Sequence, residues 1–150
     1  MGNICRSPTA EAVLHLLVQQ RAPQLAFEVD SAGTHAYHVG EPPDLRSQRT
    51  AAAHGTDMSS LRARVLRVQD FSYFDQIVVM DRDNLAAVMA LRPTPSHAEV
   101  HLLLDFLPDQ PLREVPDPYY GKAADFEQVY QLCNRAAEAL LAHWVTRSAG

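Results

Sequence analysis

Residues 2–7 read Gly-Asn-Ile-Cys-Arg-Ser and form a short loop directly before a segment with helical spacing. In such a loop the backbone N–H groups and the positive end of the helix dipole point at one spot, which favours a bound anion. Arg6 adds a planar guanidinium that can bind two phosphate oxygens at once. We expect Ser7 to cap the helix and donate to the anion, and Asn3 to bond across the loop in a left-handed conformation. A glycine turn with a surface arginine fits residues 2–7 equally well.

A second candidate segment lies near the other end of the chain, where residues 115–121 read Val-Pro-Asp-Pro-Tyr-Tyr-Gly. The two prolines stiffen the backbone around Asp117 and hold its carboxylate in place. Tyr119 and Tyr120 follow in a loop, where adjacent exposed aromatic side chains are typical of a pocket wall. Taken alone, the segment favours an ordinary Asp-Pro turn with both tyrosines folded onto the surface.

Length, composition and charge limit the classes of protein to which the chain can belong. The 150 residues are enough to bury a core, so we expect one domain over residues 1–150. The sequence is 47% hydrophobic with a formal net charge of -5, which argues against nonspecific nucleic-acid or membrane binding. No apolar run has membrane-spanning length and no signal peptide precedes the first predicted helix, so we expect a cytoplasmic location. Cys5 and Cys133 are too few for a disulfide framework or a structural zinc site.

Apolar spacing predicts helices and strands that alternate along the chain. We expect a helix that ends at Gly55, helices over residues 8–20, 83–91 and 123–144, and strands over 26–30, 76–80 and 100–104. Strands that alternate with helices imply an α/β fold, in which helices cover both faces of a short parallel sheet. Three strands make a thin parallel sheet, which suggests that a strand is absent before the first helix. Cys133 lies on the apolar face of the last predicted helix, so we expect it in the core.

The two candidate segments together resemble the low-molecular-weight protein tyrosine phosphatase family, through GNICRSP near the start and DPYYG near the end. The stretches SAGTHAYHVGEPPD, HGTDMSSLRAR, FDQIVVMDRDNL and DFEQVYQLC also follow the family's order and spacing. The resemblance therefore covers essentially the whole chain. It implies a three-layer α-β-α fold with a parallel sheet of four strands and a phosphate-binding loop before the first helix.

The resemblance implies hydrolysis of phosphotyrosine and other aryl phosphate monoesters through a phosphocysteine intermediate, with no metal or other cofactor. By the same resemblance Arg6 holds the equatorial oxygens, and Asp117 protonates the leaving phenolate and later activates water. Asn3 matches the residue that fixes the loop shape, and Ser7 the hydroxyl that supports the thiolate. Further positions match the family's loop, the walls of the slot for the phenyl ring and the mouth of that slot: Gly2 and Cys5 in the loop, Tyr119 and Tyr120 at the walls, and Met1, Ile4 and Tyr37 at the mouth.

The resemblance also implies binding partners. The substrate is a tyrosine-phosphorylated protein, for which bacterial members suggest a tyrosine kinase of polysaccharide export, and we expect phosphate or another oxyanion in the loop. We expect no nucleic-acid or membrane partner. Asp81, at the end of the central strand, is expected to order the loop through a backbone hydrogen bond.

The sequence departs from the family at the nucleophile. The family's catalytic cysteine lies six residues before the loop arginine, and six residues before Arg6 is the position preceding Met1. Cys5 is no substitute, because six residues after it lies Glu11 rather than an arginine. The family's first, interior strand is absent together with the nucleophile, which leaves two rows of backbone groups without partners.

We interpret this departure as a misassigned start codon, as a truncation closed by strand exchange in a homodimer, or as a relic that only binds phosphate. As written, the chain is expected to be inactive or severely impaired. The alternative function is therefore a non-catalytic pseudophosphatase that binds phosphate or phosphotyrosine. Arsenate reductase, on the same fold, is less favoured because it needs additional cysteines, and none lies between Cys5 and Cys133.

Overall fold

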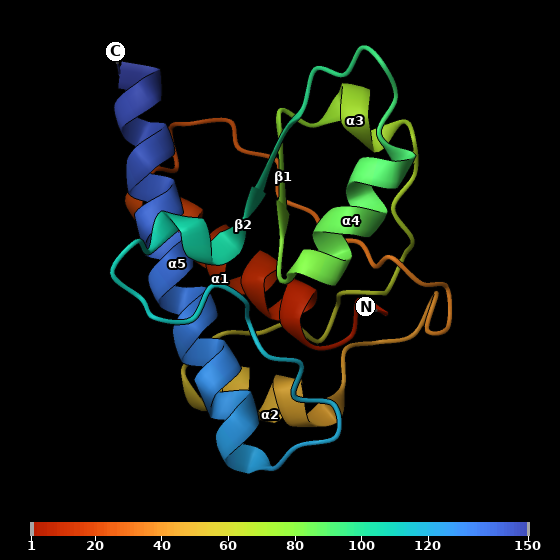
Figure 1. The fold of residues 1–150 in the computed structure, drawn as a ribbon. Helices are drawn as coiled ribbons and strands as arrows, with labels where there is room; N and C mark the ends of the chain where they lie inside the picture. Colours follow the sequence, from red (N-terminus) through yellow and green to blue (C-terminus); the bar gives the residue numbers. More distant parts are fainter. Residues whose placement is uncertain (1, 150) are drawn as a thin grey trace.

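The computed structural model describes residues 2–149 and contains helices on both sides of a two-stranded parallel sheet (Figure 1). The elements in chain order are α1 (Arg6–Arg21), α2 (Leu45–Ala53), α3 (Asp70–Tyr73), β1 (Gln76–Val79), α4 (Arg82–Leu91), β2 (Glu99–Leu102), the 3-10 helix η1 (Leu103–Phe106) and α5 (Ala123–Ala149). The predicted α/β class with a short parallel sheet is confirmed. None of the helices in this part of the chain is both long and apolar enough to cross a membrane.

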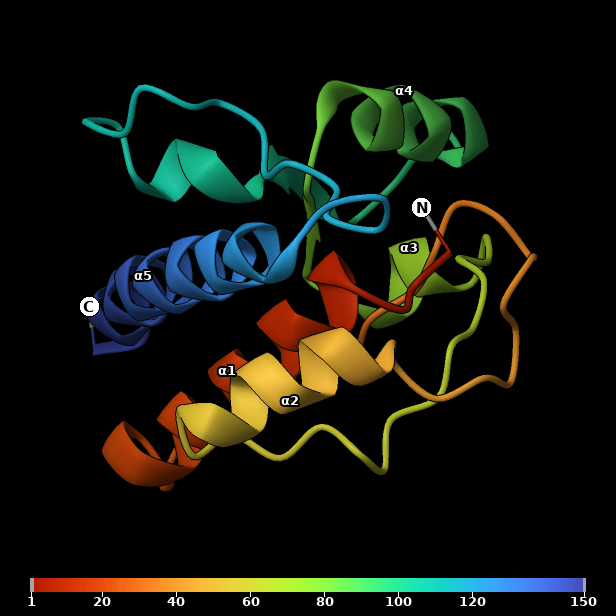
Figure 2. The same ribbon diagram turned by 90° about the horizontal axis from the view of Figure 1, so that it is seen from below.

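The structure has three layers with the sheet in the middle, and Figure 2 shows them from below. β1 and β2 pair in parallel with Ile77 opposite Val100, and this pairing forms the middle layer. One face packs on α3 and α4 through Phe71, Val79, Val88 and Leu102. The other face packs on α5, where the buried set includes Met80, Leu104, Val129, Cys133 and Leu140. Cys133 is fully buried, so its predicted place in the core is confirmed.

A second core joins α1, α2 and α5 on the side away from α4. Its buried members are Ala12, Val13, Leu17, Val18, Ala51, Met58, Tyr130, Ala137 and Leu141. On α1 and α5 these residues recur at helical spacing, and this periodicity predicts both helices. Figure 1 shows α1 crossing behind α5, and this core packs the two helices together.

The predicted strand over residues 26–30 is wrong. This segment belongs to no strand, and the nearest bridge is a parallel one between Gly33 and Val65. A strand needs a hydrogen-bonded neighbour, and residues 26–30 have none in the described chain. The predicted strand over 100–104 is shifted as well, because pairing ends at Leu102 and η1 follows.

The expected cap of the first helix by Ser7 is also wrong. α1 begins at Arg6, with Cys5 as the residue before it and no side-chain cap. Ser7 and Pro8 therefore lie within the first turn, where a backbone N–H needs no intrahelical partner, so proline fits without loss. The helix starts earlier than predicted because the loop backbone runs into it without a break.

Substitution of Met58 tests the second core. Met58 is 1% exposed and packs among α1, α2 and α5, so Met58→Ala leaves a cavity that these helices cannot close. We expect the free energy of unfolding to fall by about 2–5 kcal/mol, measured by urea denaturation. Met89 on α4 is 46% exposed and provides the matched control, for which Met89→Ala should change stability by less than about 0.5 kcal/mol. Equal effects of the two variants would contradict the packing described here.

Candidate active site

The loop before α1 is held in shape by Asn3. Asn3 has a left-handed backbone (φ 64°), and its side chain bonds in two directions. Its Nδ2 donates to Ser31 Oγ at 2.9 Å, and its Oδ1 accepts the backbone N–H of Arg64 at 3.1 Å. Ser31 Oγ in turn donates to Glu11 on α1 at 2.6 Å. The Asn3 amide therefore fixes the loop against two neighbouring segments of the chain.

Gly2 lies beneath the ring of His38. A Cβ atom on Gly2 would lie 2.5 Å from His38 Cδ2, so any larger residue would displace the ring. Glu41 holds that ring through a contact of 2.6 Å between its Oε2 and His38 Nδ1. The start of the loop therefore needs a glycine for close approach rather than for its own backbone angle. Met1 lies outside the described residues.

Arg6 is the most constrained charged group of the site. It is 4% exposed, and its Nη1 donates to Asp81 Oδ2 and to the backbone oxygen of Val115, both at 2.7 Å. Within residues 2–149 its Nε and Nη2 atoms have no protein partner. These two nitrogens form an edge with parallel donors, which matches two oxygens of a phosphate group.

Asp81 connects the loop to the end of β1. Its Oδ1 accepts the backbone N–H of Asn84 and caps α4 at 2.7 Å, while its Oδ2 binds Arg6. Partial burial raises the pKa of Asp81, but the bonds from Asn84 and Arg6 outweigh it and hold the pKa below its usual value. Asp81 thus orders the loop through the Arg6 side chain, and not through the backbone bond that the resemblance implied.

The segment with Asp117 is attached to the same place. The N–H of Val115 donates to the backbone oxygen of Met80 at 2.9 Å, next to the bond that Val115 accepts from Arg6. The exposed carboxylate of Asp117 accepts the N–H of Tyr119 at 3.1 Å, which orients it locally. Burial is the main cause that raises the pKa of Cys5, and the charge of Asp117 adds to it in a smaller degree. The backbone bonds of Val115 join the segment that carries Asp117 to the end of β1 beside Arg6.

The three tyrosines of the implied slot differ in how they are placed. Tyr119 is half-buried against the cluster of Ile4, Cys5 and Phe126, and its ring meets Tyr120 edge-on with 4.9 Å between centroids. Tyr120 is 97% exposed and Tyr37 is 81% exposed. The Tyr37 ring meets the His35 ring edge-on, with 5.4 Å between the ring centroids. Tyr119 forms a wall, whereas Tyr37 and Tyr120 project into solvent.

Arg46 holds this wall in place, and sequence reasoning missed it. Its guanidinium binds both oxygens of Asp44 at 3.1 and 2.9 Å and donates to the backbone oxygen of Tyr119 at 2.9 Å. It also lies 4.6 Å above the ring of Phe126. Asp44 caps α2 and donates its own N–H to the backbone oxygen of Ile4. The one signal in the sequence was the Asp-Leu-Arg triplet directly after two prolines.

Cys5 is a poor nucleophile where it lies. Burial raises the pKa of its thiol to about 11, although a hydrogen bond with Ser47 opposes the shift. At neutral pH the thiol is therefore protonated. Ile4 is buried beside it with Phe126, so Ile4 supports the loop from below instead of lining a mouth.

Neither Cys5 nor the other potential ligands gather as a metal site. Among residues 2–149, no group of three or more His, Cys, Asp or Glu side chains is arranged to hold a metal ion.

Substitution of Asp81 tests the bond on which the loop depends. Asp81→Asn keeps an oxygen to cap Asn84 but removes the countercharge of buried Arg6, so the free energy of unfolding at pH 7 should fall by about 2–4 kcal/mol. A lowered folded-state pKa contributes stability above the unfolded value near about 4 and loses it as pH falls through the folded value. The difference between wild type and variant, from urea denaturation, should therefore shrink below pH ~4.

The matched control for this measurement is Asp83→Asn, since Asp83 is exposed in the first turn of α4. It should change stability by less than about 1 kcal/mol at pH 7. Equal losses for both variants would show that the charge of Asp81 is not what holds Arg6.

Comparison with known proteins places this geometry in a family. Residues 1–148 match the family model described as low molecular weight phosphotyrosine protein phosphatase. The human protein of that name is 42% identical over 143 residues, which cover 94% of this chain and 89% of the human one. The crystal structure of a protein tyrosine phosphatase from Entamoeba histolytica, with Hepes in its active site, has a TM-score of 0.92. It is 34% identical and the match covers 99% of this chain and 94% of that one.

A bacterial structure extends the comparison to a ligand. Wzb of Vibrio vulnificus in complex with benzylphosphonate has a TM-score of 0.81 and is 29% identical, with 93% of this chain and 91% of that one covered. The sequence match, the shared fold and the constrained arginine loop agree. The chain belongs to the low-molecular-weight phosphotyrosine protein phosphatase family, whose members are hydrolases.

Proposed function

We propose that the loop of residues 2–7 binds the phosphoryl group of phosphotyrosine and that Arg6 holds two of its oxygens. The observation that carries this proposal is the buried Arg6, fixed through Nη1 alone, with Nε and Nη2 free of protein partners in the described chain. Fixing one nitrogen orients the plane of the guanidinium before any anion arrives. α1 begins at Arg6, so the positive end of its dipole lies at this loop and favours a bound anion.

The reaction then needs a nucleophile and an acid. A cysteine thiolate attacks phosphorus and forms a phosphorus–sulfur bond, while the phosphorus–oxygen bond to the tyrosine breaks. Asp117 gives its proton to the leaving phenolate oxygen. Water, deprotonated by Asp117, then cleaves the phosphorus–sulfur bond and releases phosphate, which restores both thiolate and acid.

We propose that this cysteine belongs to a segment that precedes Met1. Residues 1–150 place no cysteine six residues before Arg6, and the thiol of Cys5, with a pKa of about 11, does not supply the thiolate. Residues 1–150 alone should therefore bind phosphate without turnover. The same observation supports the second candidate function, a pseudophosphatase.

The substrate class follows from the wall beside the loop. Tyr119 offers an aromatic face that Arg46 and Phe126 hold in place, and this face suits a phenyl ring. The relative from Vibrio vulnificus binds benzylphosphonate, which has a phenyl group next to a phosphonate. We propose tyrosine-phosphorylated proteins as substrates, with a bacterial tyrosine kinase as one candidate. One domain over residues 1–150 and a cytoplasmic location remain predictions from the sequence.

Turnover of an aryl phosphate by three chains tests the proposed nucleophile. We expect residues 1–150, with their mass confirmed, to be silent and to gain thermal stability from orthophosphate by linkage. The same chain preceded by an apolar strand that ends in cysteine should be active, and the strand that ends in serine should not. Equal activity of all three chains would contradict an upstream nucleophile and make Cys5 the next residue to test in that role. No stabilisation by orthophosphate would remove the loop from the proposal.

Substitution of Asp117 in the active extended chain tests the acid. Asp117→Asn should lower kcat by about 10²- to 10⁴-fold while leaving the affinity for orthophosphate nearly unchanged. Asp109→Asn, at another exposed loop aspartate, is the matched control and should keep full activity. A kcat for Asp117→Asn equal to that of the control would exclude Asp117 from the mechanism.

A further inference from the structure

The acid segment, residues 114–118, carries Asp117 and begins beside the turn between β1 and α4. Glu114 reaches across this turn, where its Oε2 accepts the backbone N–H of Arg82, the first residue of α4, at 2.7 Å. The two residues are 32 positions apart in the sequence. Figure 1 shows the chain between η1 and α5 passing close to the start of α4, where this bond forms. The proposed reaction gives Glu114 no role.

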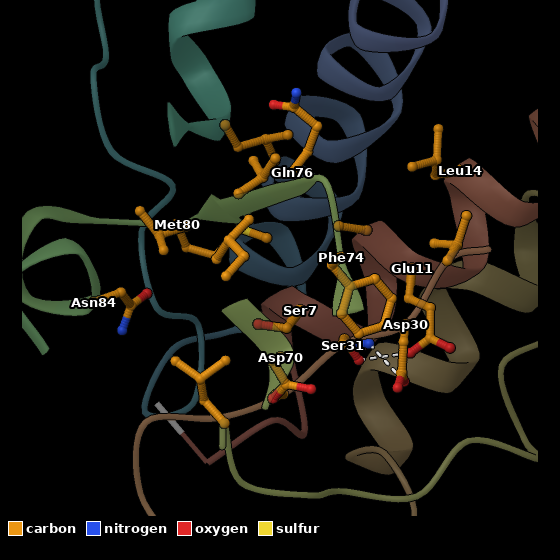
Figure 3. Close-up of a pocket in the computed structure, with 18 of the residues that line it drawn as sticks. Ser7, Glu11, Leu14, Asp30, Ser31, Asp70, Phe74, Gln76, Met80 and Asn84 are labelled. Atoms are coloured by element: carbon orange, nitrogen blue, oxygen red, sulfur yellow. Dashed lines mark hydrogen bonds between the residues drawn. The ribbon is translucent and has the colours of Figure 1, made fainter. Parts of the chain in front are cut away.

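Val115 provides the second attachment of the acid segment. Its N–H donates to the backbone oxygen of Met80 at 2.9 Å, and its own oxygen accepts Nη1 of Arg6 at 2.7 Å. Its side chain is 1% exposed in the core beside α5. Figure 3 shows Met80 where β1 ends and Asn84 in the first turn of α4, on the two sides of the turn between them. The start of the acid segment is therefore fixed at two adjacent residues.

The rest of the acid segment is short and stiff. Pro116 and Pro118 restrict the backbone on both sides of Asp117, and Pro118 is fully buried. Asp117 is exposed, and its carboxylate accepts the N–H of Tyr119, two residues later. A bond of this kind orients the carboxylate relative to its own loop, and not relative to Arg6. The position of Asp117 relative to Arg6 therefore depends on how the segment is attached at its start.

Two carboxylates share the N-terminus of α4, and each belongs to a different part of the site. Asp81 accepts the N–H of Asn84 and also holds Arg6. Glu114 accepts the N–H of Arg82 and begins the acid segment. The first N–H groups of a helix lack intrahelical partners, and the helix dipole favours negative charge there. The first turn of α4 is thus a common support for the arginine and for the general acid.

We propose that Glu114 is a positioning residue, which sets the place of Asp117 through its bond to the first turn of α4. The inference rests on the proposed function, because it assigns the effect of Glu114 to the proton that Asp117 delivers. The backbone bonds of Val115 fix one residue, about which the segment can turn, and the bond of Glu114 removes that freedom. Proton transfer needs the acid within hydrogen-bond distance of the leaving oxygen, so a small displacement of Asp117 lowers the rate.

Leaving-group dependence in the active extended chain tests this role. The value of kcat/KM covers the steps up to departure of the leaving group. For phenyl phosphate, whose phenolate needs a proton, Glu114→Ala should lower kcat/KM by about tenfold or more. For dinitrophenyl phosphate, whose phenolate departs without a proton, kcat/KM should fall by less than about twofold. Inhibition by orthophosphate should stay unchanged, because Glu114 does not touch the anion loop.

Conservative variants separate the hydrogen bond from the charge. Glu114→Gln keeps an oxygen at the same reach, so kcat/KM for phenyl phosphate should stay within about threefold of wild type. Glu114→Asp keeps the charge but is one methylene shorter, so it should behave as Glu114→Ala does. Glu138 on α5 bonds to Arg21 and Asn134 and is the matched control, for which Glu138→Ala should keep full activity.

Combination with Asp117→Asn locates the effect. If Glu114 acts through Asp117, then Glu114→Ala should cause no further loss of kcat/KM once Asp117 is replaced. A further loss of about tenfold in the double variant would overturn the positioning role. Equal losses on both substrates for Asp117→Asn alone would overturn the proposed acid. Leaving-group dependence for Asp117→Asn, with Glu114→Ala equal to wild type, would overturn the positioning role and leave the acid in place.

Hydrogen exchange in residues 1–150 tests the attachment without any turnover. Glu114→Ala and Glu114→Asp should speed exchange of the Arg82 and Val115 amides by about tenfold or more, and Glu114→Gln should not. The Asn84 amide, bonded to Asp81, is the internal control and should keep its protection. Unchanged exchange at Val115 in Glu114→Ala would overturn the proposal, whatever the activity of the extended chain. Loss of protection at Asn84 as well would also overturn it, because α4 as a whole would then have frayed.

Discussion

The bond from Arg6 to Asp81 and Val115 is the constraint on which the rest of the site depends. It joins positions 75 and 109 residues apart in the sequence. A guanidinium buried away from water is strongly destabilising unless oxygen atoms accept its hydrogen bonds. Burial of Arg6 therefore requires Asp81 and the backbone oxygen of Val115 to lie beside the loop. The place where they meet is the carboxyl end of β1, where parallel strands direct their following loops and where open α/β sheets bind ligands. Tyr119 and its supporting Arg46 then complete one wall around that point.

The sheet is the least complete part of the fold. β1 and β2 form a single hydrogen-bonded ladder, and helices pack against both faces of it. The α1–α2–α5 core does not depend on the sheet, because its buried residues come from helices and their connections. That independence explains how the loop keeps its shape although β1 has an open edge. The loop is fixed by α1 behind it and by Asn3 and Arg6 at its sides.

Local signals in the sequence were sufficient for most helices and for β1. α4 and α5 follow from apolar periodicity, and the buried run of residues 76–80 predicted β1. Residues 26–30 were misassigned because their alternation is that of a strand, whereas a strand exists only with a partner that the sequence cannot place. Ser7 was misassigned as a cap because loop and helix are continuous in backbone.

The polar supports of the site were harder to predict. Arg46, Ser31, Glu11 and Arg64 act through bonds that span 20 to 73 residues, and no spacing rule reports such bonds. Arg6 and Asn3 were found because their residue types are typical of one short anion-binding loop, although their bonds reach Asp81, Ser31 and Arg64. The family resemblance supplied the roles of Asp117 and Tyr119, which spacing alone left as an ordinary turn.

The burial of both cysteines has a consequence for chemical labelling. Burial raises the pKa of Cys5 to about 11 and that of Cys133 to about 12, so both thiols are protonated near pH 7. Alkylating reagents react with the thiolate and need access, and these two side chains provide neither. The cysteines of residues 2–149 should therefore not react with alkylating reagents. One accessible thiol of low pKa placed at the loop would then be the single site of alkylation.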